Sequence, residues 1–449
     1  MGQRGTTADL AGLGVTTEFE PDVMEVLVAT VRRAVRGESA FAGTDTLLAE
    51  LVMGDSAAGA VIAPGMRKSG GLSGFIQARA GLGWVSEDEA GGGGGQGAWA
   101  DEVEVEAAWR EAWWRFGLGL RESARESIPA VPPVLSGAMR SCLLRALASA
   151  RAEGTVSVRC RHVARALLEL PDSRAREALL LRRLDAAEAL TRLDRLEAEA
   201  AGSDEAGERP ESYGVLLLRR AGTVGRSGNR LSRAFTSWTA QSGVNGSPVL
   251  FAVNVEATRQ AARCGRDTAQ PVDLLLGALA LDRALAVAGR ALPEGLVEAN
   301  AASAVLRRHG VRQVSLVASA GASVSAGSVA SAGASVSVRS VASAEASVSV
   351  RSVASVEASV SASAGSVASA ASVDGGADQA GGGRARLSAA AERAIAVARL
   401  RAAERGAPTV GTVHLLSALL DDAGVTELLA AAQVDLAALR DELDGLAGA

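Results

Sequence analysis

The 449-residue sequence has almost no lysine, a residue on which many nucleotide-hydrolysing sites depend. Lys68 is its only lysine, and the other basic residues are arginines. A P-loop requires Gly-x-x-x-x-Gly-Lys followed by Ser or Thr, because the lysine and the backbone amides hold the phosphates. The segment around Lys68, GMRKS at 65–69, has a different spacing and order. ATP hydrolysis of the P-loop type is therefore excluded.

Residue patterns for other kinds of catalysis are also missing. The chain has three histidines and three cysteines, with no Cys-x-x-Cys spacing and no Gly-x-Ser-x-Gly motif. We therefore predict a protein without enzymatic activity, with no catalytic residue, no metal site and no cofactor.

Long apolar runs are absent as well. No stretch approaches the ~20 apolar residues that a membrane-spanning helix needs, so we expect no membrane association. The odd number of cysteines argues against a disulfide framework and favours a reducing compartment, so we predict a cytoplasmic location. A net charge of -5 gives the whole chain no attraction to nucleic acid.

The residues that are abundant favour helices. Hydrophobic residues make up 48% of the chain and aromatic residues only 3%, with many Ala, Leu and Arg. At ~100 to 200 residues per domain, the length implies at least two cores. We therefore predict an all-α protein with more than one domain.

Shifts in composition and internal repetition divide the chain. Four copies of one helix-turn-helix unit align without gaps, and the alignment places His162 over His414, with Thr46 and Asp273 at the same position. The predicted segments are an N-terminal tail at 1–18, copy one at 19–90, a Gly-rich linker at 91–97, a Trp-rich helical segment at 98–130, copy two at 135–200, an Arg-rich linker at 201–245, copy three at 246–313, a Ser/Ala/Val low-complexity insert at 314–383 that is expected to be disordered, and copy four at 384–449.

The fourth copy shows how each unit is expected to fold. Its first helix, from Leu387, has apolar residues at i, i+3 and i+4, and it ends at Gly406. Thr412 is predicted to be the N-cap of the next helix. One further helix is expected over VTELLAAAQVDLAALRDEL, and the second copy has a similar segment near Arg176.

The fourth copy, with VGTVHLLSALL at 410–420, resembles the Clp N-terminal (Clp R) repeat, whose signature is Val-Gly-Thr-Glu-His-Leu-Leu-x-x-Leu-Leu. The likeness is clear over the last sixty or so residues, moderate in copy two and weaker in copies one and three. In Clp and Hsp100 unfoldases, two such repeats form one small all-α domain ahead of the AAA+ motors. The resemblance therefore implies four repeats that form two pseudo-twofold domains, without the motors.

The resemblance also suggests ligand-binding residues. In some relatives the Thr and Glu of the signature help to form a pocket for phosphoarginine, so Thr44, Asp45, Thr412 and His414 are the candidates here. Only Thr44 with Asp45 keeps both chemical roles, because Val413, Arg161 and Val272 replace the Glu in the other copies. For His162 and His414, a local hydrogen bond that fixes the turn between helices is favoured over a ligand role.

The resemblance implies a protein that binds protein segments, adaptors or components of a Clp unfoldase or protease. Two alternatives remain. One alternative to this function is a decoy that sequesters ligands of the unfoldase N-domain. The other is a nucleic-acid-associated regulator that uses the Arg-rich linker. Trp109 and Trp113, one helical turn apart, are assigned to core packing rather than to a partner surface.

Overall fold

The computed structural model describes residues 18–66, 70–88, 99–118, 129, 131–155, 157–202, 211–224, 247–311, 316 and 386–446. All of these belong to one of the two compact units of the chain. The predicted tail at 1–18 except its last residue, the Gly-rich linker at 91–97 and the insert at 314–383 except residue 316 lie outside the described residues.

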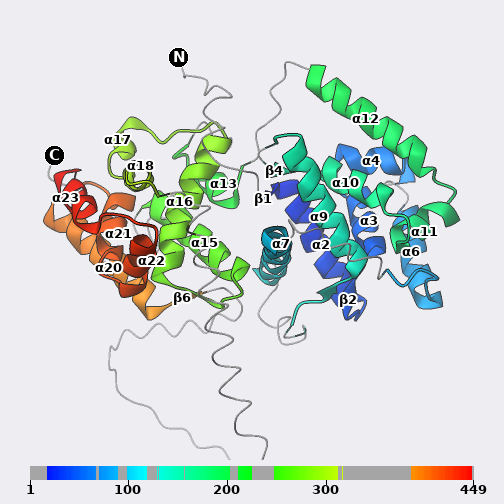
Figure 1. Ribbon diagram of the computed structural model, residues 1–449, viewed down its shortest axis with the longest axis horizontal. Coiled ribbons are helices and arrows are strands. Elements are labelled where there is room, and N and C mark those ends of the chain that lie inside the picture. The colour runs from blue at the N-terminus through cyan, green and yellow to red at the C-terminus, as the bar shows by residue number, and fades with distance from the viewer. Residues whose placement is uncertain are drawn as a thin grey trace, which may run out of the picture. The chain divides into compact units, whose positions relative to one another are not determined.

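The described residues are mostly helical, which confirms the predicted all-α fold (Figure 1). The helices of copies one and two are α2 (Pro21–Arg36), α3 (Thr44–Met53), α4 (Ala57–Ile62), α6 (Gly71–Leu82), α9 (Gly137–Ala152), α10 (Cys160–Glu169), α11 (Arg174–Leu181) and α12 (Ala186–Gly202). Those of copies three and four are α15 (Pro248–Arg263), α16 (Pro271–Val287), α17 (Glu294–Val297), α18 (Ala302–Arg308), α20 (Ala389–Glu404), α21 (Thr412–Leu419), α22 (Ala423–Ala431) and α23 (Leu436–Leu446). Outside the copies lie α7 (Trp99–Leu118) and α13 (Tyr213–Arg220).

The first helix of each copy, namely α2, α9, α15 or α20, ends in the same way. The second residue after each helix adopts a left-handed conformation, and the N–H of the residue that follows it bonds back to the last helical turn. The left-handed residues are Glu38, Gly154, Gly265 and Gly406. Their spacing is that of the ungapped alignment, so the backbone repeats where the sequence repeats.

The starts of these helices also repeat. A serine is the N-cap of α9, α15 and α20, and its hydroxyl accepts a hydrogen bond from the N–H three residues later. These serines are Ser136, Ser247 and Ser388. In copy one the aligned residue is Glu20, whose side chain makes no such bond.

Short parallel strands join the copies in pairs. The strand before the first helix of copy one, β1 (Glu18–Phe19), pairs with the strand before the second helix of copy two, β4 (Ser157–Val158). Reciprocally, β2 (Phe41–Ala42) pairs with β3 (Val134–Leu135). The strand pairing between the two copies is therefore reciprocal. In the second pair of copies, β5 (Thr268–Ala269) pairs with β6 (Arg386–Leu387).

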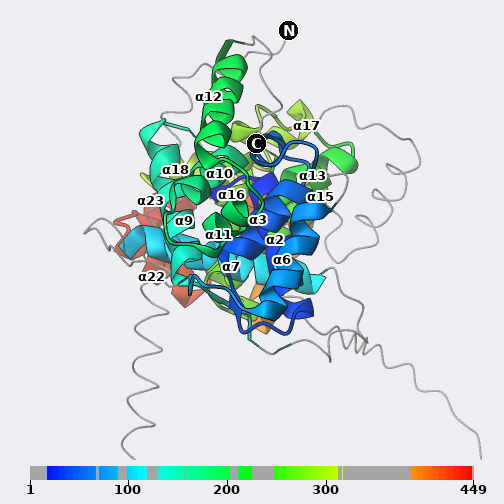
Figure 2. The same ribbon diagram turned by 90° about the vertical axis from the view of Figure 1, so that its right-hand side faces the viewer.

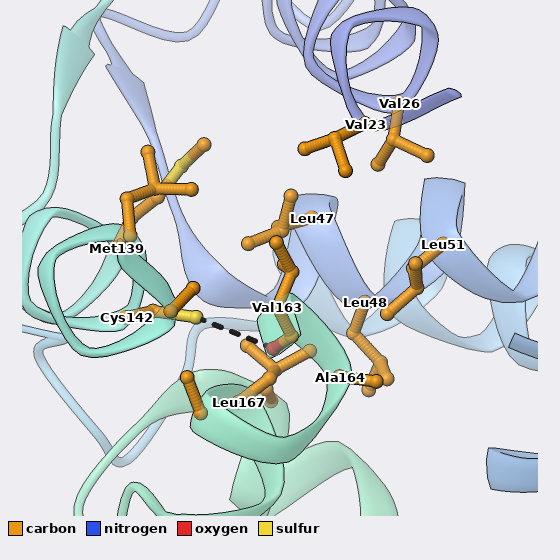
Figure 3. Packing of buried hydrophobic residues seen from close by; sticks show 14 of the residues in the cluster. Val23, Val26, Leu47, Leu48, Leu51, Met139, Cys142, Val163, Ala164 and Leu167 are labelled. Carbon is orange, nitrogen blue, oxygen red and sulfur yellow. Dashed lines mark hydrogen bonds between the residues drawn. The ribbon is translucent and has the colours of Figure 1, made fainter. Parts of the chain in front are cut away.

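Each pair of copies has its own apolar core. In the first, Leu47 and Leu48 of α3 lie against Val163 and Leu167 of α10, while the Cys142 thiol donates to the Val163 carbonyl oxygen at 3.7 Å (Figure 3). The second core is built in the same way from α15, α16, α20 and α21. Burial of ~1.5 to 3 kcal/mol per large side chain makes these cores the main source of stability.

Helix α7 packs against α2, α9 and α15. Trp109 is buried in the first core and donates its indole N–H to the Pro133 carbonyl oxygen at 2.7 Å, while Trp113 packs against the edge of the same core. Burial acts to raise the pKa of Glu111 on this helix. The guanidinium groups of Arg259, Arg115 and Arg263 nevertheless lower it to about 2.

Two details of the predicted organisation are wrong. The predicted third helix of copy four is broken into α22 and α23, because Gln433 adopts a left-handed conformation. In copy two, Arg183 breaks the corresponding segment between α11 and α12 in the same way. The predicted Arg-rich linker at 201–245 contains α13, whose Val215 and Leu218 are buried against α15 and α16. Residues 225–246 of that linker lie outside the described residues.

Helix α12 packs against α4 and α10. Figure 2 shows α12 beside α10. No helix within the described ranges is long and apolar enough to cross a membrane.

The left-handed turns make a prediction about stability. A side chain at Gly406 would meet no atom within 4 Å, so Gly406→Ala should cost only the strain of a positive φ, about 1 kcal/mol of unfolding free energy. Glu38→Gly, at the aligned turn of copy one, relieves that strain and should not destabilise the protein. Urea denaturation followed by circular dichroism would measure both. A loss of stability in Glu38→Gly would contradict the shared turn geometry.

Candidate functional site

The second helix of each copy, α3, α10, α16 or α21, begins at the signature position. The residue at the aligned histidine position binds back to the preceding turn in three copies. His162 Nδ1 accepts from the Arg159 N–H at 2.9 Å, His414 Nδ1 from the Gly411 N–H at 3.2 Å, and Asp273 Oδ2 from the Gln270 N–H at 2.8 Å. These side chains therefore fix the turn between helices, as expected for the two histidines.

Both histidines are buried, and burial lowers the pKa of each. A neutral ring suits these contacts, because Nδ1 must be unprotonated to accept a hydrogen bond. The proton then resides on Nε2, which in His162 lies 3.0 Å from a Glu153 carboxylate oxygen. In both rings Nδ1 is therefore engaged by the turn before the helix.

The prediction that Thr412 is an N-cap is wrong. Helix α21 begins at Thr412 itself, the N-cap is Gly411, and the Thr412 hydroxyl is buried without a hydrogen-bond partner among the described residues. A methyl group at Gly411 would lie 2.0 Å from the Ala299 carbonyl oxygen. Glycine is required there because another segment packs directly on the backbone.

That segment supplies oxygens to the start of α21. The Thr412 N–H donates to Asn300 Oδ1 at 3.1 Å, and the Val413 N–H donates to the Ala299 carbonyl oxygen at 3.0 Å. Two first-turn amides of this helix, which would face a bound anion, thus have partners from copy three.

The start of α3 has an internal partner of a different kind, the carboxylate of Asp88. Its Oδ2 accepts from the Thr44 N–H at 2.8 Å and from the Ser136 hydroxyl at 2.6 Å. Its Oδ1 accepts from the Thr44 hydroxyl at 2.5 Å and from the Arg174 N–H at 3.0 Å. Asp88 is buried, and it joins the starts of α3, α9 and α11.

Asp45 is also buried beside this carboxylate. A methyl group at Gly43 would lie 2.4 Å from Asp45 Oδ1, 3.1 Å from Asp88 Oδ2 and 3.6 Å from Arg174 Nη1, so all three charged groups surround one glycine. Asp45 Oδ1 has no hydrogen-bond partner among the described residues. Burial and the neighbouring Asp88 raise the pKa of Asp45, while Arg174 lowers it. The net result is a pKa of about 6.

Two groups of the chain itself already occupy this place, because Arg174 lies near Asp45 and Asp88 accepts from the Thr44 N–H. An external anion at Thr44 would have to displace Asp88. Sequence reasoning missed both Asp88 and Asn300. For Asp88 the reason is that an acidic run before a Gly-rich stretch normally indicates a solvated linker. Thr44 with Asp45 and Thr412 with His414 lie in separate copies, and each group lies at the start of its own helix.

The start of α10, in copy two, faces an open cavity of about 650 Å³. Its lining comes from α2, α4, α10, α12 and the end of α3, and it includes the apolar side chains of Val26, Met53 and Leu196. The charged residues of the lining are mostly acidic. Two arginines, Arg159 and Arg161, face six carboxylates: Glu20, Asp22, Glu25, Glu50, Asp55 and Glu197.

The carboxylates differ in how they are held. Glu20 accepts from Ser157 and Arg159, and burial raises its pKa. Glu50 pairs with Arg33, and Glu197 pairs with Arg165. Asp22 and Glu25 on the first turns of α2 are exposed at the rim. Cys160 also lines the cavity, and burial raises the pKa of its thiol.

Comparison with known proteins identifies one part of the chain. Residues 386–449 match the Clp repeat (R) N-terminal domain family. Over these residues the chain is similar to that family. No curated protein and no solved structure gives a match to the chain. The match covers α20 to α23 and so includes the Gly411, Thr412 and His414 turn. The same turn is built in α10, with His162 in the place of His414.

No group of three or more His, Cys, Asp or Glu side chains with the geometry of a metal site occurs within the described ranges.

The carboxyl of Asp45 predicts a pH dependence of stability. The pKa is about 6 in the folded state against 3.8 for the ordinary group, so between pH 4 and 6 the folded protein binds more protons than the unfolded chain. Stability should therefore fall as pH rises through this window, by up to about 3 kcal/mol. Asp45→Asn should remove the fall and raise the melting temperature above pH 6. The exposed Glu169→Gln serves as control, and an Asp45→Asn profile identical to wild type would contradict the assignment.

Loss of the Asp88 carboxylate should be more damaging. Asp88→Ala leaves two backbone N–H groups and two hydroxyls near the core without their acceptor, which should cost about 3 kcal/mol or more of unfolding free energy. The exposed neighbour in Glu87→Ala should change stability little. Equal denaturation midpoints for the two variants would show that Asp88 does not hold the helix starts together.

Proposed function

We propose that the protein is a non-enzymatic interaction module of a Clp system, which binds cationic polypeptide segments in the acidic cavity at the start of α10. The proposal rests on this cavity, because its lining combines apolar side chains with more carboxylates than arginines. Its volume of about 650 Å³ lies within the ~300 to 1,000 Å³ usual for ligand pockets. A Clp repeat domain in the same chain supports a protein-interaction role.

The chemistry of the lining favours arginine or lysine side chains in a short peptide. An aliphatic stem would contact Val26, Met53 and Leu196, of which Met53 is 37% exposed. The cationic head would then reach Asp22 and Glu25 at the rim, which are not buried against a neighbouring helix. Carboxylates in a partly enclosed cavity attract a cation more strongly than they would on an open surface.

The helix starts at Thr44 and Thr412 are less suited to an external ligand. Their first amides already donate to Asp88, Asn300 and Ala299. We therefore assign partner recognition to the cavity, and a structural role to these two signature positions. The protein would then act on partners of a Clp unfoldase or protease by binding their basic segments, either as an adaptor or as a competitor for them.

A peptide titration tests the proposal. A fluorescent peptide with alternating Arg and apolar residues should bind the full-length protein, and its affinity should fall with added salt. Asp22→Asn combined with Glu25→Gln should weaken binding roughly threefold to tenfold, because each exposed ion pair contributes up to ~1 kcal/mol. Glu427→Gln, an exposed carboxylate on α22, should leave affinity unchanged.

Two results would contradict the proposal. One is equal binding of a peptide in which Glu replaces every Arg. The other is an unchanged affinity in the double variant, which would place peptide binding elsewhere. Competition between the protein and a Clp unfoldase for the same peptide would distinguish a competitor from an adaptor, because an adaptor should increase delivery of the peptide.

A further inference from the structure

A second, much smaller cavity of about 60 Å³ is lined by three arginines. These are Arg115 of α7, Arg259 of α15 and Arg283 of α16. Hydroxyls of Ser157 and Ser212 and the carboxylate of Glu20 also reach its wall. Space of this size holds a few water molecules or one small ion, and it excludes a peptide or a nucleotide.

Two of the arginines have carboxylate partners. Arg115 pairs with Glu111, which lies behind the cavity wall and is itself buried. Arg259 donates to Glu256 at 2.8 Å and lies 3.4 Å from Glu111. The positive charges of Arg115 and Arg259 are thus balanced within the protein.

Arg283 differs from them. It is only 9% exposed, and it forms no hydrogen bond or ion pair with any residue that the structure describes. Its neighbours along the cavity wall are Ala280 and Ala284, which offer methyl groups. The Glu20 carboxylate, which also lines the cavity, bonds to Ser157 and Arg159. The guanidinium of Arg283 therefore keeps its hydrogen-bond donors free for a ligand in the cavity.

We propose that this cavity binds one small tetrahedral oxyanion of the phosphate class, with Arg283 as its main counter-charge. The guanidinium fork of Arg283 matches two oxygens of such an ion. Arg259 and Arg115 add positive potential, and the Ser212 hydroxyl, which accepts from the Val215 N–H, retains its own proton to donate. The volume of the cavity limits the site to a single ion.

Thermal unfolding of the full-length protein in inorganic phosphate tests this site. Phosphate or sulfate at millimolar concentration should raise the melting temperature above that in sodium chloride of equal ionic strength, since a ligand of the folded state stabilises it. Arg283→Gln should weaken phosphate binding on the order of tenfold, the loss expected for one charge-assisted contact. Arg401→Gln is the control, because Arg401 on α20 pairs with Asp421 and does not line the cavity. This variant should bind phosphate as the wild-type protein does.

Arg283→Lys guards against a folding defect. It keeps the positive charge, so it should retain part of the phosphate effect even if Arg283→Gln unfolds. Phosphorus-31 NMR gives a second measurement. The site is supported if wild-type protein broadens the phosphate signal, while Arg283→Gln does not broaden it or Arg283→Lys broadens it less. An equal effect of phosphate and chloride on wild type, or an unchanged phosphate affinity in both variants, would overturn it.

Discussion

Amide groups at buried helix starts need acceptors, and much of the candidate site follows from this need. When two copies pack together, the first turns of their second helices leave water and lose the solvent as a partner. The protein supplies oxygens and nitrogens from nearby side chains and from the facing copy. His162, Asp273 and His414 bind the turn before the helix, while Asp88, Asn300 and Ala299 bind the first amides from outside. A signature that suggests ligand binding is thus used to hold the fold together.

The two kinds of acceptor have different electrostatic consequences. At α21 the partners are a neutral amide and a carbonyl, so no charge is buried. At α3 the partner is a carboxylate, which lies beside a second carboxyl on Asp45 and needs Arg174 to balance it. The start of α3 therefore carries a buried cluster of charged groups that the start of α21 lacks. Charge also concentrates in the first pair at its surface, in the cavity beside α10.

Periodicity and alignment were sufficient to predict the helical class and the repeated turns. The glycines at 154, 265 and 406 occupy aligned left-handed turns, and the aligned histidines bond locally as expected. What the sequence did not indicate depends on contacts between distant segments. Asp88 lies 44 residues from Thr44 and 86 from Arg174, and nothing in its neighbours distinguishes it from a solvated acid. The break at Gln433 was missed because a non-glycine residue rarely adopts a positive φ.

The pairing of β5 with β6 has a consequence for synthesis of the chain. Copy three ends at about residue 311, but its partner strand and helices extend from 386 to 446. At ~5 to 20 residues per second, the ribosome needs on the order of ten seconds to deliver them. Throughout that interval the apolar face of α16, later covered by α20, α21 and α22, has no partner from its own domain. The nascent chain thus presents the kind of exposed apolar surface that holding chaperones bind, and the order of its segments sets how long that exposure lasts.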